Sequence, residues 1–510
     1  MFSDAETQVV DIISRWLYSK SKDDNSTQTA NILITSQGCN STELAEVPCQ
    51  TDETIVEDKE MAEDSNPSAT LEFLLRVEPE ITKILKQNLL SHAFDSCSLS
   101  WDNITPDKKT GPLFTLKHKP PSDSETDMPV TALTWSATGS VIAAGYGHFN
   151  HIDLCWHKSS LLTWNLDRHA SKAADPDTSL LVDNCIMSLA FHPERAVILT
   201  GGVFNGNIIV WDLGREDEHA VVSTFLLQFG HTDPVNQIQW IKSGNKSRLK
   251  QYNILSFGGD GRIIIWEVEL VKKSIVPMFQ CRLVTSCIPK NIRVKKGRAQ
   301  DALGISYAGL SHDDSKILIV GTEGGNVFKC SLHGIVLKER TLLDKVIEDS
   351  IVNLAFKPII GPIYSVSCSY FHRNIFLTCG TDAAVSIYSM LDINPIMMIH
   401  TNSHHYLFCA EWSPFRPGVF ICGSGSGEIL IYDICHSRHV PVDTILTNIE
   451  KRPVYTVKFN EKRRQLVASG DGTGTVVIWE LSSELCNQKQ NELKVLERLH
   501  ANARDVSHIV

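Results

Sequence analysis

Two polar side chains in the middle of the chain, His231 and Asp260, have the types that general acid–base catalysis uses. They are accompanied by Ser256 and Trp266, and the four stand at regular places around two apolar runs, PVNQIQW and YNILSFGGDGRIIIW. Side chains spaced in this way are typical of a buried hydrogen-bonded quartet that fixes the geometry of a repeat. We therefore interpret all four as structural, and we predict no catalytic residue and no enzymatic activity.

Other chemistry-bearing patterns are absent from the sequence. No GxxxxGK[ST] phosphate loop occurs, so any ATP hydrolysis must belong to a partner. No Cys-x-x-Cys pair occurs, and the neighbouring His404 and His405 lack spaced partners, so we expect no zinc site and no cofactor. Many of the 14 cysteines lie within strand-like apolar runs, where a free thiol behaves as a small hydrophobe; examples are Cys185, Cys330, Cys409 and Cys422.

Composition indicates a soluble intracellular protein. The 510 residues are 42% hydrophobic, which is enough for a large core, and the net charge of −11 disfavours binding to nucleic acid or an anionic membrane. The N-terminus has no signal-peptide pattern, and no apolar run is long enough to insert into a membrane.

One hydrophobic phrase repeats along the C-terminal three quarters of the chain. An alternating run, a Gly-rich turn and a second apolar run ending in Trp-Asp or a variant recur about every 40 to 50 residues, which is typical of WD repeats that each form a four-stranded blade. We count seven phrases, which end near Trp164, Trp211, Trp266, Cys330, Tyr388, Tyr432 and Trp479. The sequence thus predicts an all-β fold, a seven-bladed WD-repeat β-propeller over residues 112–482.

Closing this ring requires a strand from outside the last repeat. Residues 112–119, PLFTLKHK, are our favoured closing strand. The competitor is the tail at 483–510, but Leu493, Leu496 and Leu499 follow a helical spacing there. Repeats other than the third lack parts of the quartet, with Thr473 and Ser426 where Asp is expected, so we expect apolar packing to stabilise those blades.

Residues 1–69 differ in kind from the repeats. Nine acidic residues between Glu43 and Asp64 face a single Lys59, and such a segment buries too little apolar surface to fold alone, so we predict a disordered acidic arm. Within it lie two β-prone triplets, Thr27-Gln28-Thr29 and Cys49-Gln50-Thr51. An extended peptide of this kind can add a strand to an exposed sheet edge.

Residues 70–95 follow the spacing of an amphipathic helix, and 96–111 form a linker to the ring. The apolar positions of the helix are Leu71, Leu74, Leu75, Val77, Ile81, Ile84, Leu85 and Leu89. Pro79 lies within the pattern and should kink the helix or restart it at its first turn. The helix either packs against the side of the propeller or lies in the groove of a partner.

This order of parts resembles the dynein intermediate chain family. Specific phrases agree, among them AAGYGHFNHIDLCW, LAFHPERAVILTGGVFNGNIIVWDL and GHTDPVNQIQW, and RVEPEITKILKQNLLSHAFD is most similar to the intermediate chains of cytoplasmic dynein-2, the motor of retrograde intraflagellar transport. The resemblance implies a non-catalytic subunit of the cytoplasm, cytoskeleton and cilium, at the axoneme and basal body.

The resemblance also implies partners. The triplets around Gln28 and Gln50 would bind the small hub light chain, and the helix from Leu71 onward would bind a roadblock-type light chain. The propeller would bind the dynein-2 heavy chain, beside a second intermediate chain and near intraflagellar-transport trains.

Two alternatives stay open. Within the family, the chain could serve cytoplasmic dynein-1 or an axonemal arm. In another class, WD propellers act as substrate receptors of ubiquitin ligases; those often carry Trp-Asp-x-Arg, whereas here Arg215 comes one residue late after Trp211-Asp212.

Overall fold

The computed structural model describes residues 67–90, 110–117, 128–151, 155–168, 175–215, 219–225, 230–243, 252–289, 300–333, 351–401 and 405–507. The chain divides into two compact units, one ending at Ser91 and the other beginning at His92. The first contains helix α1 (Pro67–Leu90), and the second is a ring of β-sheets. None of the described helices has the length and hydrophobicity needed to cross a bilayer.

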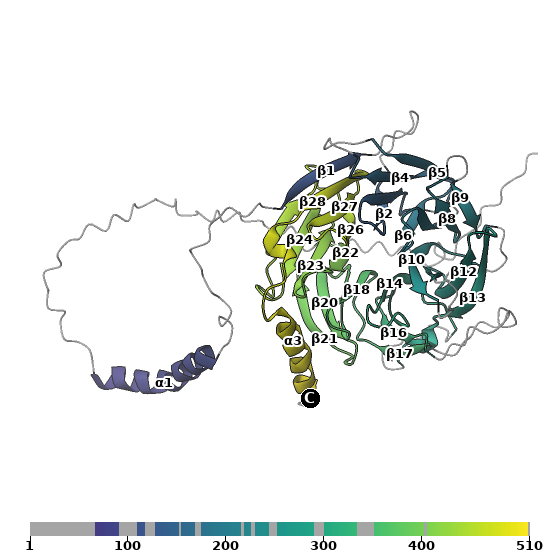
Figure 1. The fold of residues 1–510 in the computed structure, drawn as a ribbon. Helices are drawn as coiled ribbons and strands as arrows, with labels where there is room; N and C mark the ends of the chain where they lie inside the picture. The colour runs from purple at the N-terminus through teal and green to yellow at the C-terminus, as the bar shows by residue number, and fades with distance from the viewer. Residues whose placement is uncertain are drawn as a thin grey trace, which may run out of the picture. The chain divides into compact units, whose positions relative to one another are not determined.

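Seven antiparallel four-stranded sheets form the ring, which confirms the predicted seven-bladed propeller (Figure 1). Blades 1 to 3 consist of β2 (Val130–Trp135), β3 (Val141–Tyr146), β4 (Ser159–Asn165), β5 (Thr178–Val182); β6 (Ile186–Phe191), β7 (Ile198–Val203), β8 (Ile208–Asp212), β9 (Ala220–Ser223); and β10 (Val235–Lys242), β11 (Tyr252–Gly258), β12 (Arg262–Glu269), β13 (Ser274–Arg282). A short 3-10 turn, η3 (Thr285–Cys287), follows blade 3.

The remaining blades continue in chain order around the ring. Blades 4 to 6 consist of β14 (Ile305–Leu310), β15 (Ile317–Thr322), β16 (Val327–Ser331), β17 (Val352–Ala355); β18 (Ile363–Cys368), β19 (Ile375–Gly380), β20 (Ala384–Ser389), β21 (Pro395–His400); and β22 (Leu407–Trp412), β23 (Val419–Ser424), β24 (Glu428–Asp433), β25 (Asp443–Leu446). Blade 7 contains β26 (Val454–Phe459), β27 (Leu466–Asp471), β28 (Thr475–Glu480) and a fourth strand from the N-terminal side, β1 (Gly111–Lys117).

Strand β1 closes the ring, as its position upstream of the first repeat predicts. It pairs antiparallel with β28, with Leu116 opposite Val476 and Phe114 opposite Ile478, and a bulge lies between Pro112 and Phe114. In Figure 1 the dark blue β1 lies beside the yellow-green β28. Because the pairing leaves no strand edge open between first and last blades, closure joins parts of the chain that are far apart in sequence.

The middle strands of each blade are buried on both faces by neighbouring blades. Every residue of β19 and β20 is buried, whereas β21 at the outer edge is mostly half-exposed. This explains why the second and third strands read as continuous apolar runs. The residues predicted to end the phrases all lie in third strands, and their exposed fractions are 0 to 4%: Trp164, Trp211, Trp266, Cys330, Tyr388, Tyr432 and Trp479.

Polar groups in the innermost strands join one blade to the next. Ser188 in blade 2 donates to the carbonyl of Val235 in blade 3 at 2.7 Å, and Ser365 in blade 5 donates to the carbonyl of Ala410 in blade 6 at 2.8 Å. Satisfied hydroxyls at these contacts fix the rotation of one blade against another without a desolvation cost.

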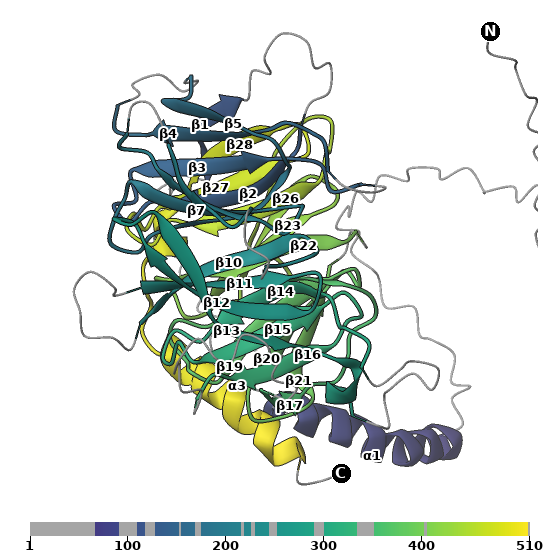
Figure 2. The same ribbon diagram turned by 90° about the vertical axis from the view of Figure 1, so that its right-hand side faces the viewer.

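Successive turns of an antiparallel sheet lie at alternate ends, so the ring has two faces. We call the first face the one that carries the turns between second and third strands and the links between blades. The second face carries the other turns. Figure 2 shows the blades from the side, with these two sets of turns at opposite ends of the strands.

Two helices follow the last strand, α2 (Ser483–Cys486) and α3 (Glu492–Ser507), so the C-terminal stretch is helical, as its spacing predicts. Helix α3 contributes Leu496 and Leu499 to the core cluster shared by blades 5 and 6. Its first residue, Glu492, accepts a hydrogen bond of 2.7 Å from Arg416, which is 1% exposed. The same guanidinium binds Asp433 at 2.6 Å, so one buried cation fastens α3 to blade 6.

Candidate interaction sites

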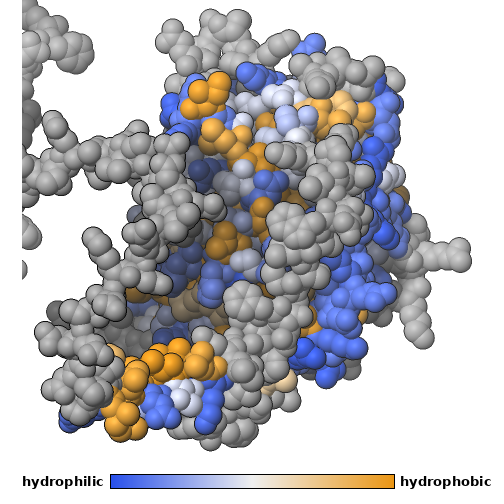
Figure 3. Space-filling view, turned by 90° about the vertical axis from the view of Figure 1, so that its left-hand side faces the viewer, coloured by the Kyte–Doolittle hydropathy of each residue, from blue (hydrophilic) through white to orange (hydrophobic). Residues whose placement is uncertain are grey.

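Helix α1 presents an apolar face that is uncovered. The helix runs without interruption through Pro79, so the sequence-based possibility of a restart at this residue is not realised. Its predicted positions keep about half or more of each side chain exposed, except the half-buried Val77: Leu71 62%, Leu74 57%, Leu75 62%, Ile81 49%, Ile84 52% and Leu85 59%. Leu89 also lies in the helix. Figure 3 shows the apolar residues gathered along one side of α1, with hydrophilic residues on the other.

The same face includes a residue that the spacing argument missed. Phe73 is 52% exposed, and the guanidinium of Arg76 lies over its ring at 5.8 Å. Such a broad apolar surface on a helix is typical of a site that lies in a partner's groove.

The two predicted light-chain triplets, with Thr27, Gln28, Thr29, Cys49, Gln50 and Thr51, lie outside the described residues.

The predicted quartet of blade 3 is joined by hydrogen bonds. His231 Nδ1 lies 3.1 Å from Asp260 Oδ1, His231 Nε2 lies 2.8 Å from the Ser256 hydroxyl, and Trp266 Nε1 donates to that hydroxyl at 2.8 Å. Asp260 also accepts the backbone N–H groups of Thr232 and Arg262. Burial works to raise the pKa of Asp260, but the hydrogen bonds from His231 and the backbone outweigh it and lower that pKa.

The surroundings of the quartet exclude a substrate. The side chains of His231 and Asp260 are 0% and 3% exposed, and both ring nitrogens of His231 already have partners. A general base must reach a proton on its substrate, and this imidazole cannot. The geometry is that of a satisfied structural network.

Blade 7 contains a related network that sequence reasoning missed. Trp479 Nε1 donates to the Ser469 hydroxyl at 2.8 Å, as Trp266 does to Ser256. The buried Asp471 accepts bonds from Thr473 Oγ1 at 2.6 Å and Asn448 Nδ2 at 2.8 Å. Polar bonds therefore stabilise this blade together with the apolar packing that we expected to dominate.

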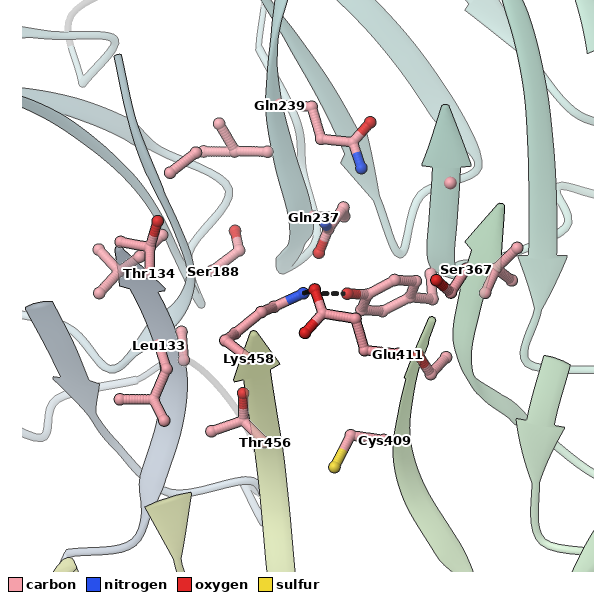
Figure 4. Close-up of a pocket in the computed structure, with 18 of the residues that line it drawn as sticks. Leu133, Thr134, Ser188, Gln237, Gln239, Ser367, Cys409, Glu411, Thr456 and Lys458 are labelled. Carbon is pink, nitrogen blue, oxygen red and sulfur yellow. Dashed lines mark hydrogen bonds and ion pairs between the residues drawn. The ribbon is translucent and has the colours of Figure 1, made fainter. Parts of the chain in front are cut away.

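A cavity of about 1480 Å³, which we call the channel, lies at the centre of the ring and is lined by both polar and apolar side chains. Inside it Lys458 Nζ lies 3.3 Å from Glu411 Oε1 and 3.4 Å from the hydroxyl of Tyr307, which belongs to the opposite side of the ring (Figure 4). Burial raises the pKa of Glu411, although Lys458 partly offsets this. Burial disfavours the charged form of Lys458, but Glu411 and Tyr307 outweigh it and raise the pKa of the amine. Lys458, Glu411 and Tyr307 thus link blades 7, 6 and 4, and because Lys458 and Glu411 bind each other, neither is free to act as an acid or base.

Aromatic side chains line one mouth of this channel on the first face. Ring centroids are 5.2 Å apart between Tyr364 and Phe408, 5.0 Å between Phe408 and Tyr455, and 4.6 Å between Tyr455 and Phe149. Phe149 is 40% exposed and the nearby Tyr406 is 53% exposed. We call these five residues the aromatic rim. Exposed aromatic rings beside polar groups are typical of protein-binding surfaces.

Comparisons with known proteins relate the chain to dynein intermediate chains and to WD repeats. A family model described as the dynein axonemal intermediate chain 3 WD40 domain matches residues 311–481, and the WD domain, G-beta repeat model matches 179–212 and 223–267. The chain is 36% identical over 431 residues to cytoplasmic dynein 2 intermediate chain 2 of Homo sapiens, covering 84% of this chain and 79% of the relative. It is 22% identical over 368 residues to the cytoplasmic dynein 1 intermediate chain of Drosophila melanogaster, covering 71% and 50%. It is 26% identical over 393 residues to the ciliary dynein intermediate chain 3 of Heliocidaris crassispina, covering 76% and 58%.

Proposed function

The chain belongs to the dynein intermediate chain family, and we propose that it is a non-catalytic intermediate chain of a cytoplasmic dynein-2 motor. The observation that carries this assignment is the 36% identity to a dynein-2 chain over 84% of the sequence, against 22% and 26% for the dynein-1 and ciliary relatives. Its work would be retrograde intraflagellar transport and cilium assembly, and its place the cytoplasm, the cytoskeleton and the cilium, at the axoneme and basal body.

Affinity purification of the tagged full-length chain tests this assignment. We expect a dynein-2 heavy chain, a second intermediate chain, a roadblock-type light chain and the small hub light chain to co-purify. A dynein-1 or axonemal heavy chain in their place would move the protein to another branch of the family. Recovery of a cullin adaptor without any motor heavy chain would support the ubiquitin-ligase alternative.

Helix α1 is the proposed site for the roadblock-type light chain. Burying one exposed leucine side chain contributes roughly 1.5 to 3 kcal/mol, and α1 offers several on one face. Such a gain can offset the ordering of the helix on binding, provided that the partner supplies an apolar groove. The alternating charges on the other face, including Glu72 and Lys83, keep the free helix soluble.

The test replaces apolar residues of this face by aspartate. The double variant Leu74→Asp with Leu85→Asp should release the roadblock-type chain, because a carboxylate in an apolar groove loses its hydration. The matched control Lys83→Asp with Lys86→Asp carries the same new residues at charged positions of the helix and should retain it. Equal binding by both double variants would reject α1 as the docking helix.

The Gln-Thr triplets are the proposed sites for the hub light chain, one extended strand at each of its two sheet edges. Two strands on one chain raise avidity because the second binds at the effective concentration set by the linker. Replacing Gln28 and Gln50 together by Ala should abolish recovery of the hub chain. The control Gln37→Ala, a glutamine between the triplets, should leave it unchanged, and hub recovery with the double variant would refute the assignment.

The aromatic rim is the proposed contact for the motor heavy chain. Its support is the gathering of aromatic rings, two of them exposed, at the mouth of the channel on one face of the propeller. Phe149→Asp with Tyr406→Asp should lower recovery of the heavy chain while light-chain binding continues. Val271→Asp is the control, because Val271 is 87% exposed in the β12–β13 turn on the second face. If only the control loses the heavy chain, the second face is the interface.

A second intermediate chain would be held through the light chains. Because the hub chain is expected to be dimeric, it would hold two intermediate chains side by side, and loss of the hub in the Gln28 and Gln50 variant should weaken recovery of the second chain as well. Contact with intraflagellar-transport trains would then be made by the assembled motor.

A further inference from the structure

The loop between β3 and β4, residues 147–158, brings two histidines and one cysteine to the boundary of blades 1 and 2. His151, Cys155 and His157 belong to this loop, and Cys185 precedes β6 of blade 2. One ligand atom from each lies within 4.8 Å of all the others. We propose that His151, Cys155, His157 and Cys185 bind a zinc ion that fastens the loop to blade 2.

The spacing of the four groups fits a tetrahedral ion. His151 Nε2 lies 3.2 Å from Cys155 Sγ, and Cys155 Sγ lies 3.8 Å from His157 Nδ1. Zinc bonds of about 2.0 Å to nitrogen and about 2.3 Å to sulfur separate tetrahedral ligand atoms by roughly 3.3 to 3.8 Å. Since no two of the four ligand atoms are more than 4.8 Å apart, each separation needs to contract by at most about 1.5 Å when the ligands close on the ion. Two thiolates and two imidazoles are a donor set that selects zinc over magnesium or calcium.

The backbone around the central ligand is held in place by blade 2. Cys155 N–H donates to Asn205 Oδ1 at 3.1 Å, and its carbonyl accepts from Asn184 Nδ2 at 2.9 Å and Asn205 Nδ2 at 3.3 Å. Both sulfurs accept backbone N–H groups, Cys155 Sγ from Cys185 at 3.3 Å and Cys185 Sγ from His148 at 3.2 Å. A backbone N–H group aimed at a sulfur stabilises the thiolate, which is the form that binds a metal, although burial outweighs this for Cys185 in the metal-free chain and raises the pKa of its thiol to about 12.

The cluster is enclosed by blade 2. Cys155 and Cys185 are fully buried, and His151 stacks on Phe204 with centroids 3.8 Å apart. This stacking fixes the plane of the imidazole and leaves Nε2 directed at Cys155 Sγ, 3.2 Å away, so Nε2 is the nitrogen that would bind the ion.

A second cluster of potential metal ligands differs from the first because a protein cation already lies in it. Asp433, Cys435 and Glu492 also lie within 4.8 Å of one another, but the guanidinium of Arg416 lies 2.6 Å from both carboxylates. That site already contains its cation. In the part of the chain that the structure describes, the blade 1–2 cluster is the other group of this kind.

The proposal departs from the sequence expectation of no zinc. That expectation rested on missing Cys-x-x-Cys pairs, whereas these ligands follow His-x3-Cys-x-His with the fourth ligand in the next blade. The ion would hold the loop that presents Phe149 to the aromatic rim and Trp156, 82% exposed, to solvent. It is a structural ion, since all four positions are occupied by protein.

Metal analysis of the full-length chain tests the site. The chain, expressed with zinc in the medium and purified without chelator, should contain one zinc per chain, and Cys155→Ser should lose it. His157→Gln changes an exposed side chain that the fold tolerates and should also lose the ion. Cys435→Ser is the matched control and should keep it. A parent chain free of zinc, or unchanged zinc in Cys155→Ser, would overturn the proposal.

Two further readouts separate an ion from other arrangements of the cluster. Cobalt(II) added to the metal-free chain should give the visible absorption of tetrahedral thiolate ligation, absent in Cys155→Ser. A chelator should lower the melting temperature of the parent chain and leave that of His157→Gln unchanged. If Cys155 and Cys185 are not alkylated after treatment with a chelator but are alkylated after treatment with a reductant, they form a disulfide. That result would reject the zinc site.

Discussion

Replacing His192 by asparagine should remove a pH dependence from the stability of the propeller. His192 follows β6, and its Nδ1 accepts the backbone N–H groups of Glu194 and Arg195, each at 3.1 Å. The residue is 8% exposed, and its ring packs edge-on against Trp240 at 4.8 Å. Burial, aided by the nearby Arg195 and partly offset by Glu194, lowers the pKa of His192 from 6.5 to about 4.

The sign follows from where the proton binds. Between pH 6.5 and about 4 the unfolded chain holds a proton on His192 that the folded chain does not, so stability increases with pH in this window. The contribution is complete above pH 6.5 and is lost as the pH falls toward 4. Each unit of pKa difference corresponds to about 1.36 kcal/mol, so the full loss is about 3 kcal/mol and the loss by pH 5 is about 2 kcal/mol.

Asparagine is a suitable replacement because the propeller already has an asparagine at the equivalent position of blade 7. Asn460 follows β26 of blade 7, and its Oδ1 accepts the N–H groups of Lys462 at 2.9 Å and Arg463 at 3.0 Å. An amide oxygen therefore supports the same turn without titrating. At pH 7.5 the His192→Asn variant should be less stable than the parent by about 1 kcal/mol, because the imidazole no longer packs on Trp240. Its stability should not decrease further through this site as the pH falls.

Urea unfolding of the full chain at pH 7.5, 6 and 5 measures the effect. The parent should lose about 2 kcal/mol more than His192→Asn between pH 7.5 and 5, because the other histidines titrate alike in both and cancel. His436→Asn, an exposed histidine in the turn after β24, should follow the parent. An identical loss in the parent and His192→Asn would show that the imidazole is not held neutral by the fold.

Five other substitutions test the anchor of α3, the Trp–Ser hydrogen bonds of two blades and one turn conformation. Arg416→Met should lower the free energy of unfolding by about 3 to 5 kcal/mol, because Asp433 and Glu492 would stay buried without their cation. Hydrogen exchange of the α3 amides should become faster, and unchanged protection of α3 would contradict the anchoring role. Trp266→Phe removes the donor to Ser256 and should lower the stability measured by thermal unfolding by about 1 to 3 kcal/mol. Trp479→Phe removes the donor to Ser469 and should lower it by a similar amount. Unchanged stability of Trp479→Phe would show that blade 7 does not depend on its hydrogen-bond network. Ala383→Gly should stabilise the chain by up to about 1 kcal/mol, because Ala383 has φ of 54° in a turn where blade 6 has Gly427 at 80°, and Gly427→Ala should destabilise it.

The fold was predictable because its signal is repeated and local. Each third strand is an apolar run that ends in a large side chain, and burial between blades requires that pattern seven times. The closing strand could be predicted for the same reason, since PLFTLKHK has the alternation of a strand and lies where a blade lacks one. The helical spacing of α1 was equally predictable from its leucines and isoleucines. Phe73 was not included because it lies at the edge of the stripe that these residues form.

The sites that were missed depend on contacts between segments that are far apart in sequence. Arg416 contacts one carboxylate 17 residues away in its own blade and another 76 residues away in α3, and neither spacing is a recognisable pattern in the unfolded chain. The ligands His151 and Cys185 belong to different blades, so a search for paired cysteines in one segment passes over them. The aromatic rim likewise gathers its five residues from four repeats, and no single repeat shows the pattern.

The closing strand also determines where the N-terminal arm is tethered. Residues 91–110 connect α1 to β1 and can span at most about 70 Å when fully extended. Any load carried by partners on α1 or the Gln-Thr triplets therefore reaches the ring at Gly111, the residue of β1 that pairs with Glu480. Strand β1 resists this load through its backbone pairing with β28 and through Leu116, 1% exposed, in the core between blades 7 and 1. The strand that completes the ring is thus also the point where the N-terminal segment joins it, and Leu116→Ala should lower the melting temperature of the propeller by leaving a cavity between blades 7 and 1.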